Sequence, residues 1–475
     1  MTYVYDRQYI NGDWCASQGD ELIVVQNPNT GELAAQVTTG HPQDAQAAVQ
    51  AAQAAFPRWS ALALEGRVQL VLKWAAALQE RKESLVRAIA AEVGTPLRIS
   101  RMVQVEAPLH NIENFVDTVR SFEWEKRIGN SLVVRDPFGV VACITPWNFP
   151  LHQIVLKLVP ALLTGNTVVL KPSELTPQTV QLIVEALHEA GFPDGVVNVV
   201  NGCGPTVGAC LAGSDAVDMV SFTGSTEAGK AVIVLAAQNV KKVATELGGK
   251  SPSVVLPGAE LERAIKASVA ACMLNNGQTC SALTRLLIPV ERVDEAIQFI
   301  EKELAKLSVG CSLDEGNRIG PLISSRQQAK VESLLETVRE QGGVGIGVAQ
   351  DNIPDHGFFI APQAFKVDES NILAHAEVFG PVLAVLTYTD VDEAVRIANS
   401  TIYGLAAAVW GDEAEAVDVA RRIQAGQVDI NGARFNALAP FGGYKQSGVG
   451  REAGEYGVEE FLQVKSIQTQ QQSGG

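Results

Sequence analysis

The chain has 475 residues, of which 47% are hydrophobic and 19% are charged. That length and composition predict a globular protein of two or three domains, with ample material for buried cores. The net charge of −16 argues against nucleic acid or an anionic membrane as the main partner, because both repel a strongly acidic chain.

The compartment is indicated by the termini, the cysteines and the histidines. The first residues contain no basic flank followed by an apolar core, and no apolar span reaches membrane length without interruption. Seven cysteines without a CxxC pair are typical of a reducing compartment, and the six histidines include no pair at metal-ligand spacing. We therefore expect a soluble cytoplasmic protein that binds no metal, no nucleic acid and no membrane.

Secondary structure is predicted first by hydrophobic spacing. From about residue 42 to residue 121, apolar residues recur every three or four positions, which predicts helices, and a strand with turn residues near its middle is expected at 131–145. Strands are then expected at 166–171, 196–202, 218–224 and 240–249, alternating with helices at 176–191, 204–213 and 225–239. Such alternation predicts a parallel sheet with helices on both faces and a ligand site beyond the carboxyl ends of its strands.

A second alternating series follows Ser251 and predicts a second α/β domain. Its expected strands are 251–256, 284–290, 358–365, 381–389 and 427–432, and its expected helices are 259–274, 292–307 and two more before residue 427. The strand at 131–142 and the strand-like tail at 461–470 have no helical neighbour. We expect both to be arms that pair outside their own domain.

The stretch "SFTGSTEAGKA", residues 221–231, is one residue short of a phosphate-binding P-loop. Ala231 stands where a Mg²⁺-dependent NTPase needs a hydroxyl, and the charge of Glu227 would oppose a triphosphate. A P-loop NTPase is therefore disfavoured. Gly224 and Gly229 still allow a tight turn whose helix amides could bind a pyrophosphate, although many glycine pairs only permit close packing.

Three residues are candidates for covalent chemistry. Cys280 lies in the polar segment "NNGQTCSA", Glu246 precedes two glycines in "TELGGKSP", and Asn148 is fixed between prolines in "PWNFP". A thiolate can attack a carbonyl, a carboxylate can act as a base, and an amide can stabilise an oxyanion. Each residue also has a simpler explanation, as a buried small side chain, a solvated loop carboxylate and a structural turn. A Cys–His protease with a remote histidine also stays open.

Other motifs suggest nucleotide contacts and a glycine-rich loop. In "VLKPSE", Lys171 and Glu174 follow a strand, where a ribose would lie. Glu377 precedes a Phe-Gly-Pro turn in "EVFGPV", and "PFGGYKQSGVGRE" is a glycine-rich loop near the end of the chain. Each of these motifs is ambiguous when taken alone.

The motifs "PWNFP", "KPSE", "FTGST", "ELGGKSP", "GQTC", "EVFGPV" and "PFGGYKQSG" occur in this order. The chain thereby resembles the NAD(P)-dependent aldehyde dehydrogenase superfamily, and the likeness runs from "YINGDW" to "EFLQVKSI". The resemblance implies a thiohemiacetal on Cys280, an oxyanion held by Asn148 and the Cys280 backbone N–H, hydride transfer to the nicotinamide, and a thioester. Glu246 would activate water to release the acid, with Lys157 and Glu452 relaying protons.

The resemblance also implies the cofactor. Glu246 favours hydrolysis over acyl transfer to coenzyme A, and Glu174 favours NAD over NADP because its carboxylate would repel a 2′-phosphate. The expected cofactor-binding residues are Thr145, Pro146, Trp147, Lys171, Ser173, Glu174, Gly204, Phe222, Gly224, Ser225, Leu247, Glu377 and Phe379.

The substrate would enter through a tunnel. Its expected lining is Phe149, Gln153, Leu156, Thr279, Ser281, Arg434 and Phe435. The largely apolar set favours a medium-chain or aromatic aldehyde. Two alternatives stay open: a semialdehyde dehydrogenase in which Arg434 binds a substrate carboxylate, and a non-catalytic protein on the same scaffold.

The implied fold is α/β: a Rossmann-like NAD-binding domain, an α/β catalytic domain and a β-strand oligomerisation arm. The expected boundaries are 1–118 with 139–248 for the first, 249–447 for the second, and 119–138 with 456–475 for the arm. A homodimer or homotetramer is expected, since an arm strand left unpaired exposes a sheet edge.

Overall fold

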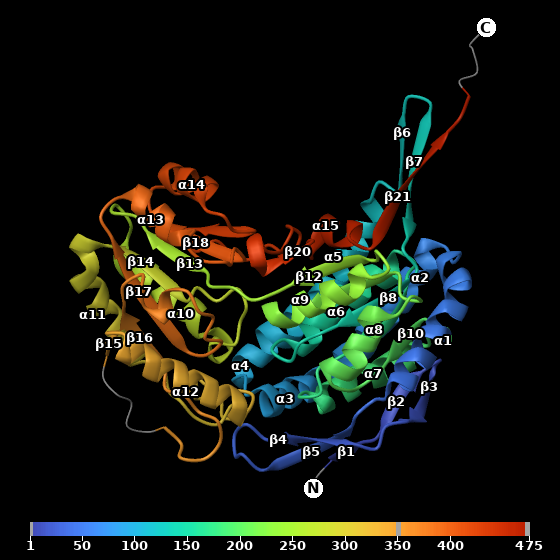
Figure 1. Ribbon diagram of the computed structural model, residues 1–475, viewed down its shortest axis with the longest axis horizontal. Coiled ribbons are helices and arrows are strands. Elements are labelled where there is room, and N and C mark those ends of the chain that lie inside the picture. The colour runs from blue at the N-terminus through green and yellow to red at the C-terminus, as the bar shows by residue number, and fades with distance from the viewer. Residues whose placement is uncertain (1–2, 348–352, 471–475) are drawn as a thin grey trace.

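The computed structural model describes residues 3–347 and 353–470, built around two large sheets (Figure 1). Residues 1–2, 348–352 and 471–475 of the predicted domains and arm lie outside the described residues. Helices and strands alternate in both halves of the chain, so the fold is α/β as predicted. The first large sheet has eight strands and the second has seven.

The eight-stranded sheet has the order β20-β12-β11-β8-β9-β10-β2-β3. Its central strands β12 to β10 are parallel, while β20, β2 and β3 pair antiparallel at the edges. The strands are β2 Arg7–Ile10, β3 Asp13–Ala16, β8 Val140–Ile144, β9 Thr167–Lys171, β10 Val197–Val199, β11 Met219–Thr223, β12 Lys242–Glu246 and β20 Gly448–Val449. Every residue of β8, β9 and β11 is buried, as expected for a parallel sheet covered on both faces.

Helices cover both faces of this sheet (Figure 1). They are α1 Pro42–Ser60, α2 Leu64–Glu80, α3 Lys82–Val93, α4 Leu97–Ile99, α5 Ala107–Ser121, α6 Pro150–Leu163, α7 Pro177–Ala190, α8 Ala209–Gly213 and α9 Thr226–Ala237. Local signals set their ends: α7 begins with Pro177, which needs no amide bond there, and stops at Gly191 with φ 71°.

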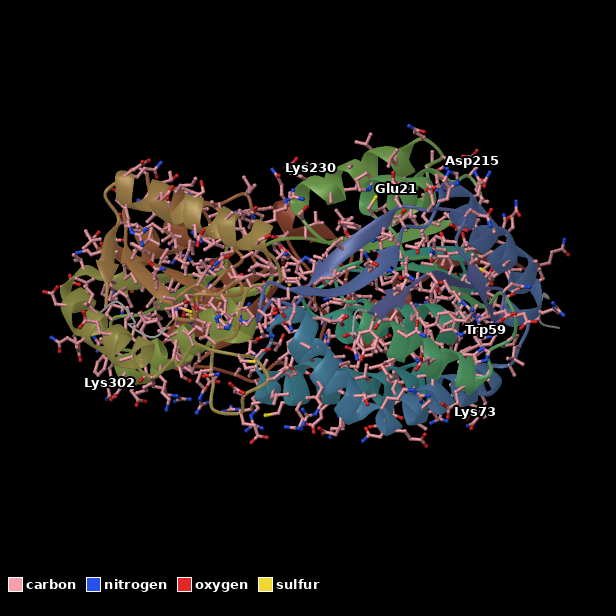
Figure 2. The ribbon with its side chains drawn as sticks, turned by 90° about the horizontal axis from the view of Figure 1, so that it is seen from below. Glu21, Trp59, Lys73, Asp215, Lys230 and Lys302 are labelled. Atoms are coloured by element: carbon pink, nitrogen blue, oxygen red, sulfur yellow. The ribbon has the colours of Figure 1, made fainter. Side chains whose placement is uncertain are left out.

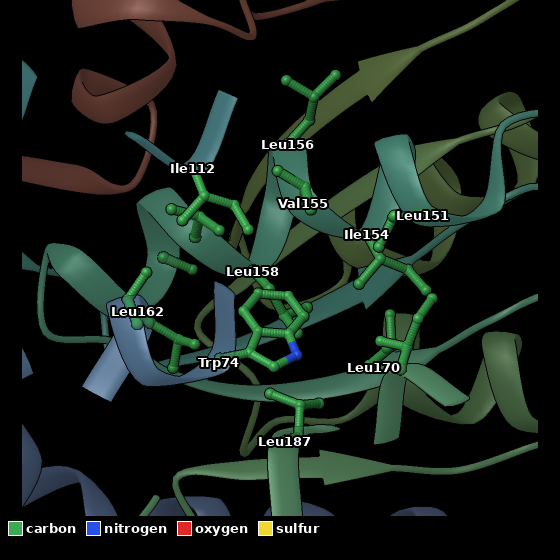
Figure 3. Packing of buried hydrophobic residues seen from close by; sticks show 14 of the residues in the cluster. Trp74, Ile112, Leu151, Ile154, Val155, Leu156, Leu158, Leu162, Leu170 and Leu187 are labelled. Atoms are coloured by element: carbon green, nitrogen blue, oxygen red, sulfur yellow. The ribbon is translucent and has the colours of Figure 1, made fainter. Parts of the chain in front are cut away.

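The main core lies between this sheet and α2, α5, α6 and α7. Trp74 of α2 packs there among Leu158, Leu162 and Leu187 (Figure 3). Burying one such side chain stabilises the fold by roughly 1.5–3 kcal/mol. The helix α6, which contributes residues from both of its halves to this core, starts at Pro150, directly after the "PWNF" segment. The core therefore fixes the position of that segment.

The seven-stranded sheet has the order β15-β16-β17-β14-β13-β18-β19, parallel except for the edge strand β15. Its strands are β13 Pro252–Val255, β14 Arg285–Pro289, β15 Val344–Ile346, β16 Gln363–Lys366, β17 Val382–Tyr388, β18 Ala406–Trp410 and β19 Gln427–Ile430. The helices around it are α10 Leu261–Met273, α11 Val293–Leu304, α12 Ser325–Glu340, α13 Val391–Ala398 and α14 Glu413–Arg422.

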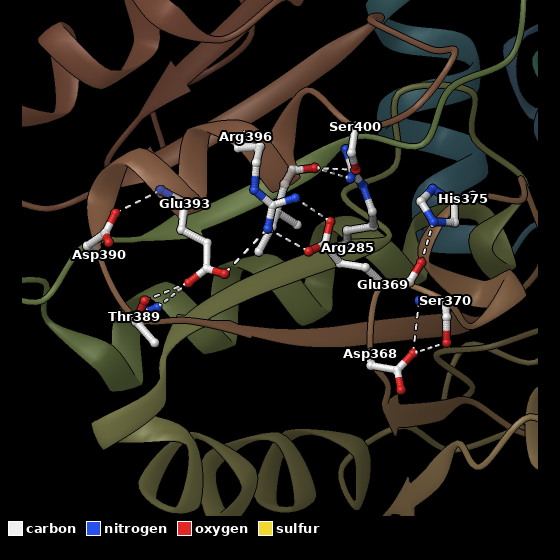
Figure 4. Close-up of polar contacts among 11 residues, drawn as sticks. Arg285, Asp368, Glu369, Ser370, His375, Thr389, Asp390, Glu393, Arg396 and Ser400 are labelled. Carbon is white, nitrogen blue, oxygen red and sulfur yellow. Dashed lines mark hydrogen bonds and ion pairs between the residues drawn. The ribbon is translucent and has the colours of Figure 1, made fainter.

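One buried cation ties this sheet to α13. Arg285, at the start of β14, donates to the carbonyls of Ile397 and Ala398 at 2.7 and 2.6 Å (Figure 4). These are carbonyls of the last turn of α13, which have no partner within their own helix. Burial lowers the pKa of Arg285 to about 9. The arginine thus closes the end of a helix beside the segment that precedes β14.

Two small sheets complete the fold. Strands β1 Tyr3–Tyr5, β4 Leu22–Gln26 and β5 Leu33–Thr38 form one of them. The other has the order β21-β7-β6, made of β21 Leu462–Gln468, β7 Ser131–Pro137 and β6 Glu125–Ile128, and it projects from the body of the molecule (Figure 1). The predicted arm strands therefore pair with each other, outside both large sheets.

Several elements differ from those predicted. The strand expected at 131–145 is two strands in different sheets, separated at Phe138 and Gly139. Gly139 has φ 138°, and a Cβ there would lie 2.1 Å from Asp218 Oδ2, so the chain turns where only glycine fits. The helix expected at 204–213 begins as a π-helical turn. The strands β1 to β5, β15, β18 and β20 and the helices α12 and α15 (Gly454–Glu459) were not predicted.

Candidate active site

The order of the strands places a ligand site between β8 and β11. From β8 the chain builds outward through β9 to β10, and then returns to β11 on the other side of β8. In open parallel sheets, a crevice forms at the carboxyl ends of the strands at such a reversal. Thr145 to Asn148 follow β8 there, and Gly224 and Ser225 follow β11.

The turn after β11 leads into α9. Ser225 caps this helix by accepting from Ala228 N at 3.3 Å. Gly229 is required by packing, because a Cβ there would lie 2.4 Å from Leu247 Cδ2. Lys230 pairs with Glu227 at 2.9 Å and projects from the outer surface of the molecule (Figure 2). The Gly-Lys pair therefore belongs to the helix itself and does not form a phosphate-binding loop.

A second polar group follows β9. Lys171 is buried and donates to the carbonyls of Pro172 and Gly202 at 2.8 and 2.7 Å, and it pairs with Glu174 at 3.2 Å. The Glu174 side chain is 27% exposed, so its carboxylate faces outward from an otherwise buried anchor. Gly204 opens the next helical turn, and a Cβ there would meet nothing within 4 Å. This end of the sheet is open enough to admit a ligand.

Cys280 lies in the connection between α10 and β14. Asn275, Asn276 and Gly277 all have positive φ, of 53°, 59° and 73°, which ends the helix and redirects the chain. Buried hydrogen bonds fix this turn: Asn276 Nδ2 donates to the carbonyls of Gly94 and Pro321 at 2.8 and 2.9 Å. Asparagine adopts this left-handed region more readily than most residues. The thiol is therefore presented from a rigid support.

Asn148 is attached to the same connection. Its Nδ2 donates to Gln278 O at 3.0 Å, two residues before Cys280. The backbone carbonyl of Asn148 accepts from Gln104 Nε2 at 2.8 Å and from Asn275 Nδ2 at 2.9 Å. The side-chain amide of Asn148 has two N–H groups, and the bond to Gln278 O uses one of them. The second is available for a bound molecule.

Glu246 ends β12, and residues 247–251 carry the chain from the carboxyl end of the first large sheet to the amino end of the second. This link passes Cys280, because a Cβ at Gly249 would lie 2.4 Å from the Cys280 carbonyl oxygen. It is held by Ser447, whose Oγ donates to Gly248 O at 2.7 Å and whose carbonyl accepts from Leu247 N at 2.9 Å. The carboxylate and the thiol are thus brought to the junction of the two sheets.

The Glu246 carboxylate is buried, and neither of its oxygens has a hydrogen-bond partner among the described residues. A Cβ at Gly442, in the glycine-rich loop, would lie 2.6 Å from Glu246 Oε1, so only glycine leaves room for the carboxylate. Burial raises the pKa of Glu246 well above its ordinary value, and the charge of Glu452 adds to that shift. Glu246 therefore holds its proton to a higher pH than an ordinary carboxyl group does.

Lys157 and Glu452 form a buried ion pair beside Glu246. The second carboxylate oxygen of Glu452 is buried without a partner in the described part of the chain. The two charges act on Glu246 in opposite directions, because Lys157 lowers its pKa while Glu452 raises it. The ion pair therefore acts on Glu246 electrostatically, without a hydrogen bond to it in the described part of the chain.

The Cys280 thiol faces an unfavourable charge environment. Burial first, and then the carboxylates of Glu246 and Glu377, together raise its pKa to about 12. Glu377 is itself held by Gly249 N, which donates to its Oε1 at 3.0 Å. Formation of the thiolate therefore needs either a base that removes the proton or a bound cation that lowers the pKa of the thiol.

A cavity of about 530 Å³ reaches Cys280. This volume is within the usual range for small-molecule sites. Its lining is largely apolar and includes Phe149, Leu156, Leu274, Leu283, Phe435 and Phe441. The Phe435 and Phe441 rings meet edge to face with centroids 6.1 Å apart. The thiol therefore lies at the wall of a cavity suited to an organic molecule.

A model of the aldehyde dehydrogenase family matches residues 14–467. The chain belongs to this family. A Staphylococcus haemolyticus protein named as an aldehyde dehydrogenase is 41% identical over 98% of each chain. Aldehyde dehydrogenase C of Pseudomonas syringae, solved as a cysteine-to-alanine variant with NAD⁺ and octanal, is 41% identical, with a TM-score of 0.95 over 97% of this chain and 96% of that one. A Mycobacterium tuberculosis aldehyde dehydrogenase complexed with NAD⁺ is 36% identical, with a TM-score of 0.95 over 100% of both chains.

The structure of the dehydrogenase brings most of the predicted site residues together. Asn148, Glu246 and Cys280 meet at the junction of the sheets, with Lys157 and Glu452 behind them. Thr145, Pro146, Trp147, Lys171, Ser173, Glu174, Gly204, Phe222, Gly224, Ser225 and Leu247 lie on or beside the strand ends of the first sheet. Trp147 also meets Phe379 edge to face at 5.5 Å, next to Glu377. The predicted roles of these residues stay predictions.

The predicted tunnel residues divide into two groups. Six of them line the cavity: Phe149, Gln153, Leu156, Thr279, Ser281 and Phe435. Arg434 is exposed and is not part of that lining. Residues that sequence reasoning missed include His152, Asp429 and Gln427 in the cavity wall, and Gln104, which holds Asn148. No local pattern marks them, because they reach the site only through the tertiary fold.

Gly277 provides a test of the support for Cys280. A Cβ there would lie 2.1 Å from the carbonyl oxygen of Gly380, and the residue has φ 73°. We expect Gly277→Ala to destabilise the dehydrogenase by at least about 2 kcal/mol, because strain and a backbone clash act together. Thermal unfolding followed by circular dichroism measures this. The control is Gly258→Ala, where a Cβ meets nothing within 4 Å. Equal melting temperatures for the two variants would contradict the expectation.

Proposed function

We propose that this dehydrogenase oxidises an aldehyde to the carboxylic acid with NAD, through a covalent intermediate on Cys280. The observation that carries the proposal is the meeting of Cys280, Asn148 and Glu246 at the wall of a largely apolar cavity, beside the reversal point of a parallel sheet. The NAD⁺ complexes of the related P. syringae and M. tuberculosis enzymes support the choice of cofactor.

The residues at the strand ends fit NAD. Thr145 Oγ1 and Thr223 Oγ1 are buried without a partner among the described residues, and the space in front of Gly204 is open. The amino end of α9 suits a pyrophosphate, and Lys171 and Glu174 suit ribose hydroxyls. When bound, NAD supplies the hydride acceptor. Its nicotinamide is cationic, and a cation near Cys280 would lower the high pKa of that thiol.

The first chemical step is attack by Cys280. The thiol loses its proton to solvent, and the sulfur forms a bond to the aldehyde carbon, while the carbonyl electron pair moves to oxygen. The second N–H of the Asn148 amide and the Cys280 backbone N–H stabilise this oxyanion. Donors held in place by the Gln104 and Asn275 bonds need no reorganisation when charge develops. After oxidation the carbon is a thioester on Cys280.

Release of the acid is assigned to Glu246. As a carboxylate it takes a proton from water, whose oxygen attacks the thioester carbon and expels the Cys280 thiolate. Lys157 and Glu452 then carry the proton away from Glu246. The absence of a hydrogen-bond partner on Glu246, among the described residues, leaves both oxygens free for water. This arrangement favours hydrolysis over transfer to coenzyme A.

We propose a medium-chain or aromatic aldehyde as the substrate. The apolar cavity wall supports this choice, and the related P. syringae enzyme has been solved with octanal. The semialdehyde alternative has less support, because Arg434 is exposed and lies outside the cavity lining. The P-loop alternative has none, since Lys230 pairs with Glu227 on the helix surface.

The predicted domain boundaries and the arm are part of this proposal. The two large sheets support an NAD-binding domain and a catalytic domain, and the projecting β21-β7-β6 sheet supports an arm that joins subunits into a dimer or tetramer. All seven cysteines are free, which supports a reducing, cytoplasmic location. Among residues 3–347 and 353–470, no helix is both long and apolar enough to cross a membrane.

The test is NADH absorbance with purified protein, NAD or NADP, and a panel of aldehydes. The panel spans short aliphatic, medium-chain, aromatic and carboxylate-bearing members, each with and without coenzyme A. We expect NADH with NAD and medium-chain or aromatic aldehydes, at a rate that coenzyme A leaves unchanged. Strict dependence on coenzyme A would contradict hydrolysis, and silence from folded protein that binds NAD would contradict the oxidation itself.

A further inference from the structure

The substrate cavity carries only one kind of charge. Among the described residues that line it, none is lysine or arginine, and Asp429 is the one carboxylate. The two histidines in the lining do not balance it. Burial lowers the pKa of His152 to about 4, so this side chain is neutral at physiological pH. His110 is exposed, and its Nδ1 lies 3.2 Å from the carboxylate of Glu113.

Asp429 is placed by β19, the edge strand of the second large sheet. Residues two apart on a strand share a face, and both Gln427 and Asp429 line the cavity. Gln427 Nε2 donates to Asp429 Oδ1 at 2.9 Å, which orients the carboxylate. The side chain is half-buried, and within the described chain neither an ion pair nor a nearby cation compensates its charge. The second carboxylate oxygen of Asp429 is available to bind a ligand.

Such a carboxylate has an energetic consequence. Removing a charge from water is costly unless it is paired, and burial accordingly raises the pKa of Asp429. A cation that enters the cavity would offset that cost, whereas a substrate carboxylate would be repelled. The cavity lining is otherwise rich in apolar residues such as Ala271, Leu283 and Ala406, and β19 contributes its two polar residues Gln427 and Asp429.

We infer that Asp429 is a specificity-determining residue, and that the cavity prefers aldehydes whose far end carries an ammonium group. The inference rests on the proposed oxidation at Cys280, because it concerns the same cavity. Gln427 fixes the carboxylate, Asp429 binds the cation, and the apolar wall holds the chain between the ammonium group and the aldehyde. Charge-assisted contacts of this kind correspond to about 10- to 100-fold in affinity.

The experiment compares two aldehydes of the same shape and different charge. 4-(Trimethylammonio)butanal is matched by 5,5-dimethylhexanal, in which carbon replaces nitrogen. We expect kcat/KM to favour the cation by about 10-fold or more in the wild type, mostly through KM. Asp429→Asn removes the charge and keeps the size, and is expected to abolish the preference by lowering kcat/KM for the cationic aldehyde. Asp429→Glu keeps the charge and is expected to retain part of the preference.

The matched control is Asp418→Asn, which removes one carboxylate from the exposed surface of α14. We expect its preference to equal that of the wild type, which separates a local contact from the net charge of the protein. A wild type without a preference would overturn the inference, and so would an Asp429→Asn variant that keeps it. A change in oligomer mass with an unchanged preference would also overturn it, because Asp429 would then serve subunit contacts.

A binding measurement separates this inference from the proposed function. Calorimetry with 4-(trimethylammonio)butan-1-ol and 5,5-dimethylhexan-1-ol needs no turnover. We expect tighter binding of the cationic alcohol to the wild type but not to Asp429→Asn. That result with no aldehyde oxidation would refute the proposed function alone. Equal binding of both alcohols, with oxidation of the neutral aldehyde intact, would refute the inference alone.

Discussion

Replacing Cys280 by alanine is expected to lower aldehyde oxidation by at least about a thousandfold, because the nucleophile is lost. NAD binding should stay within about twofold, since the residues proposed to hold the cofactor lie on other segments. Cys280 is half-buried at the wall of a cavity and alanine is smaller than cysteine, so the fold should tolerate the substitution. NADH absorbance measures the first effect, and quenching of tryptophan fluorescence by NAD measures the second.

Cys15→Ala is the matched control. Cys15 is also free and half-buried, but it lies on β3, far from the cavity in the strand order of the first sheet. We expect its activity to equal that of the wild type. Residual oxidation above one-tenth in Cys280→Ala would remove Cys280 from the nucleophile's role. Loss of NAD binding together with unfolding would assign it a structural role instead.

Glu246→Gln is expected to separate the two halves of the reaction. Glutamine keeps the shape of a buried side chain and removes only the base, so attack and oxidation continue while release of the thioester slows by about 10²- to 10⁴-fold. Stopped-flow absorbance should show a burst of NADH close to one per active site, followed by a slow steady state. Removing the Glu246 charge also removes one cause of the high pKa of Cys280, which favours the burst.

The pH dependence follows from the same side chain. Burial raises the pKa of Glu246, and the base must be deprotonated to act. Wild-type turnover should therefore fall as the pH drops through this raised pKa, well above the usual range of a carboxyl group. The Glu246→Gln variant should not show this fall in turnover at low pH. Glu291→Gln, an exposed substitution of the same type, is the control. An unchanged steady-state rate in Glu246→Gln would exclude Glu246 as the base.

Much of the fold could be predicted from local sequence. The alternation of short apolar runs with helical patterns predicted the parallel strands β8 to β12, because hydrophobic period is a local property. Pro177 and Gly191 set the ends of α7 for reasons that lie within a few residues. The polar flanks of Cys280 and the glycines after Glu246 indicated sites of close backbone approach in the same way. The ordered motifs, finally, indicated the family.

Local sequence did not predict the elements whose position depends on contacts with residues distant in the chain. The strand expected at 131–145 is divided because Gly139 meets Asp218, a residue distant in sequence that lies directly before β11. The exposed β1 and the edge strand β15 carry little hydrophobic periodicity. Their pairing with β5 and β16 depends on register across the fold, which no window of a few residues contains.

The sequence by itself determined the family and the α/β class, because these depend on residue type and order, and on the same grounds it predicts Cys280 as the nucleophile. The tertiary structure alone decided how the site is assembled. Lys157 and Glu452 are 295 positions apart and become one buried pair, and Asn148 is fixed by Asn275 from 127 positions away. Asp429 enters the cavity only because β19 lies at the edge of its sheet. Packing of distant elements creates these contacts, and it also sets the burial that shifts the pKa values of Cys280 and Glu246.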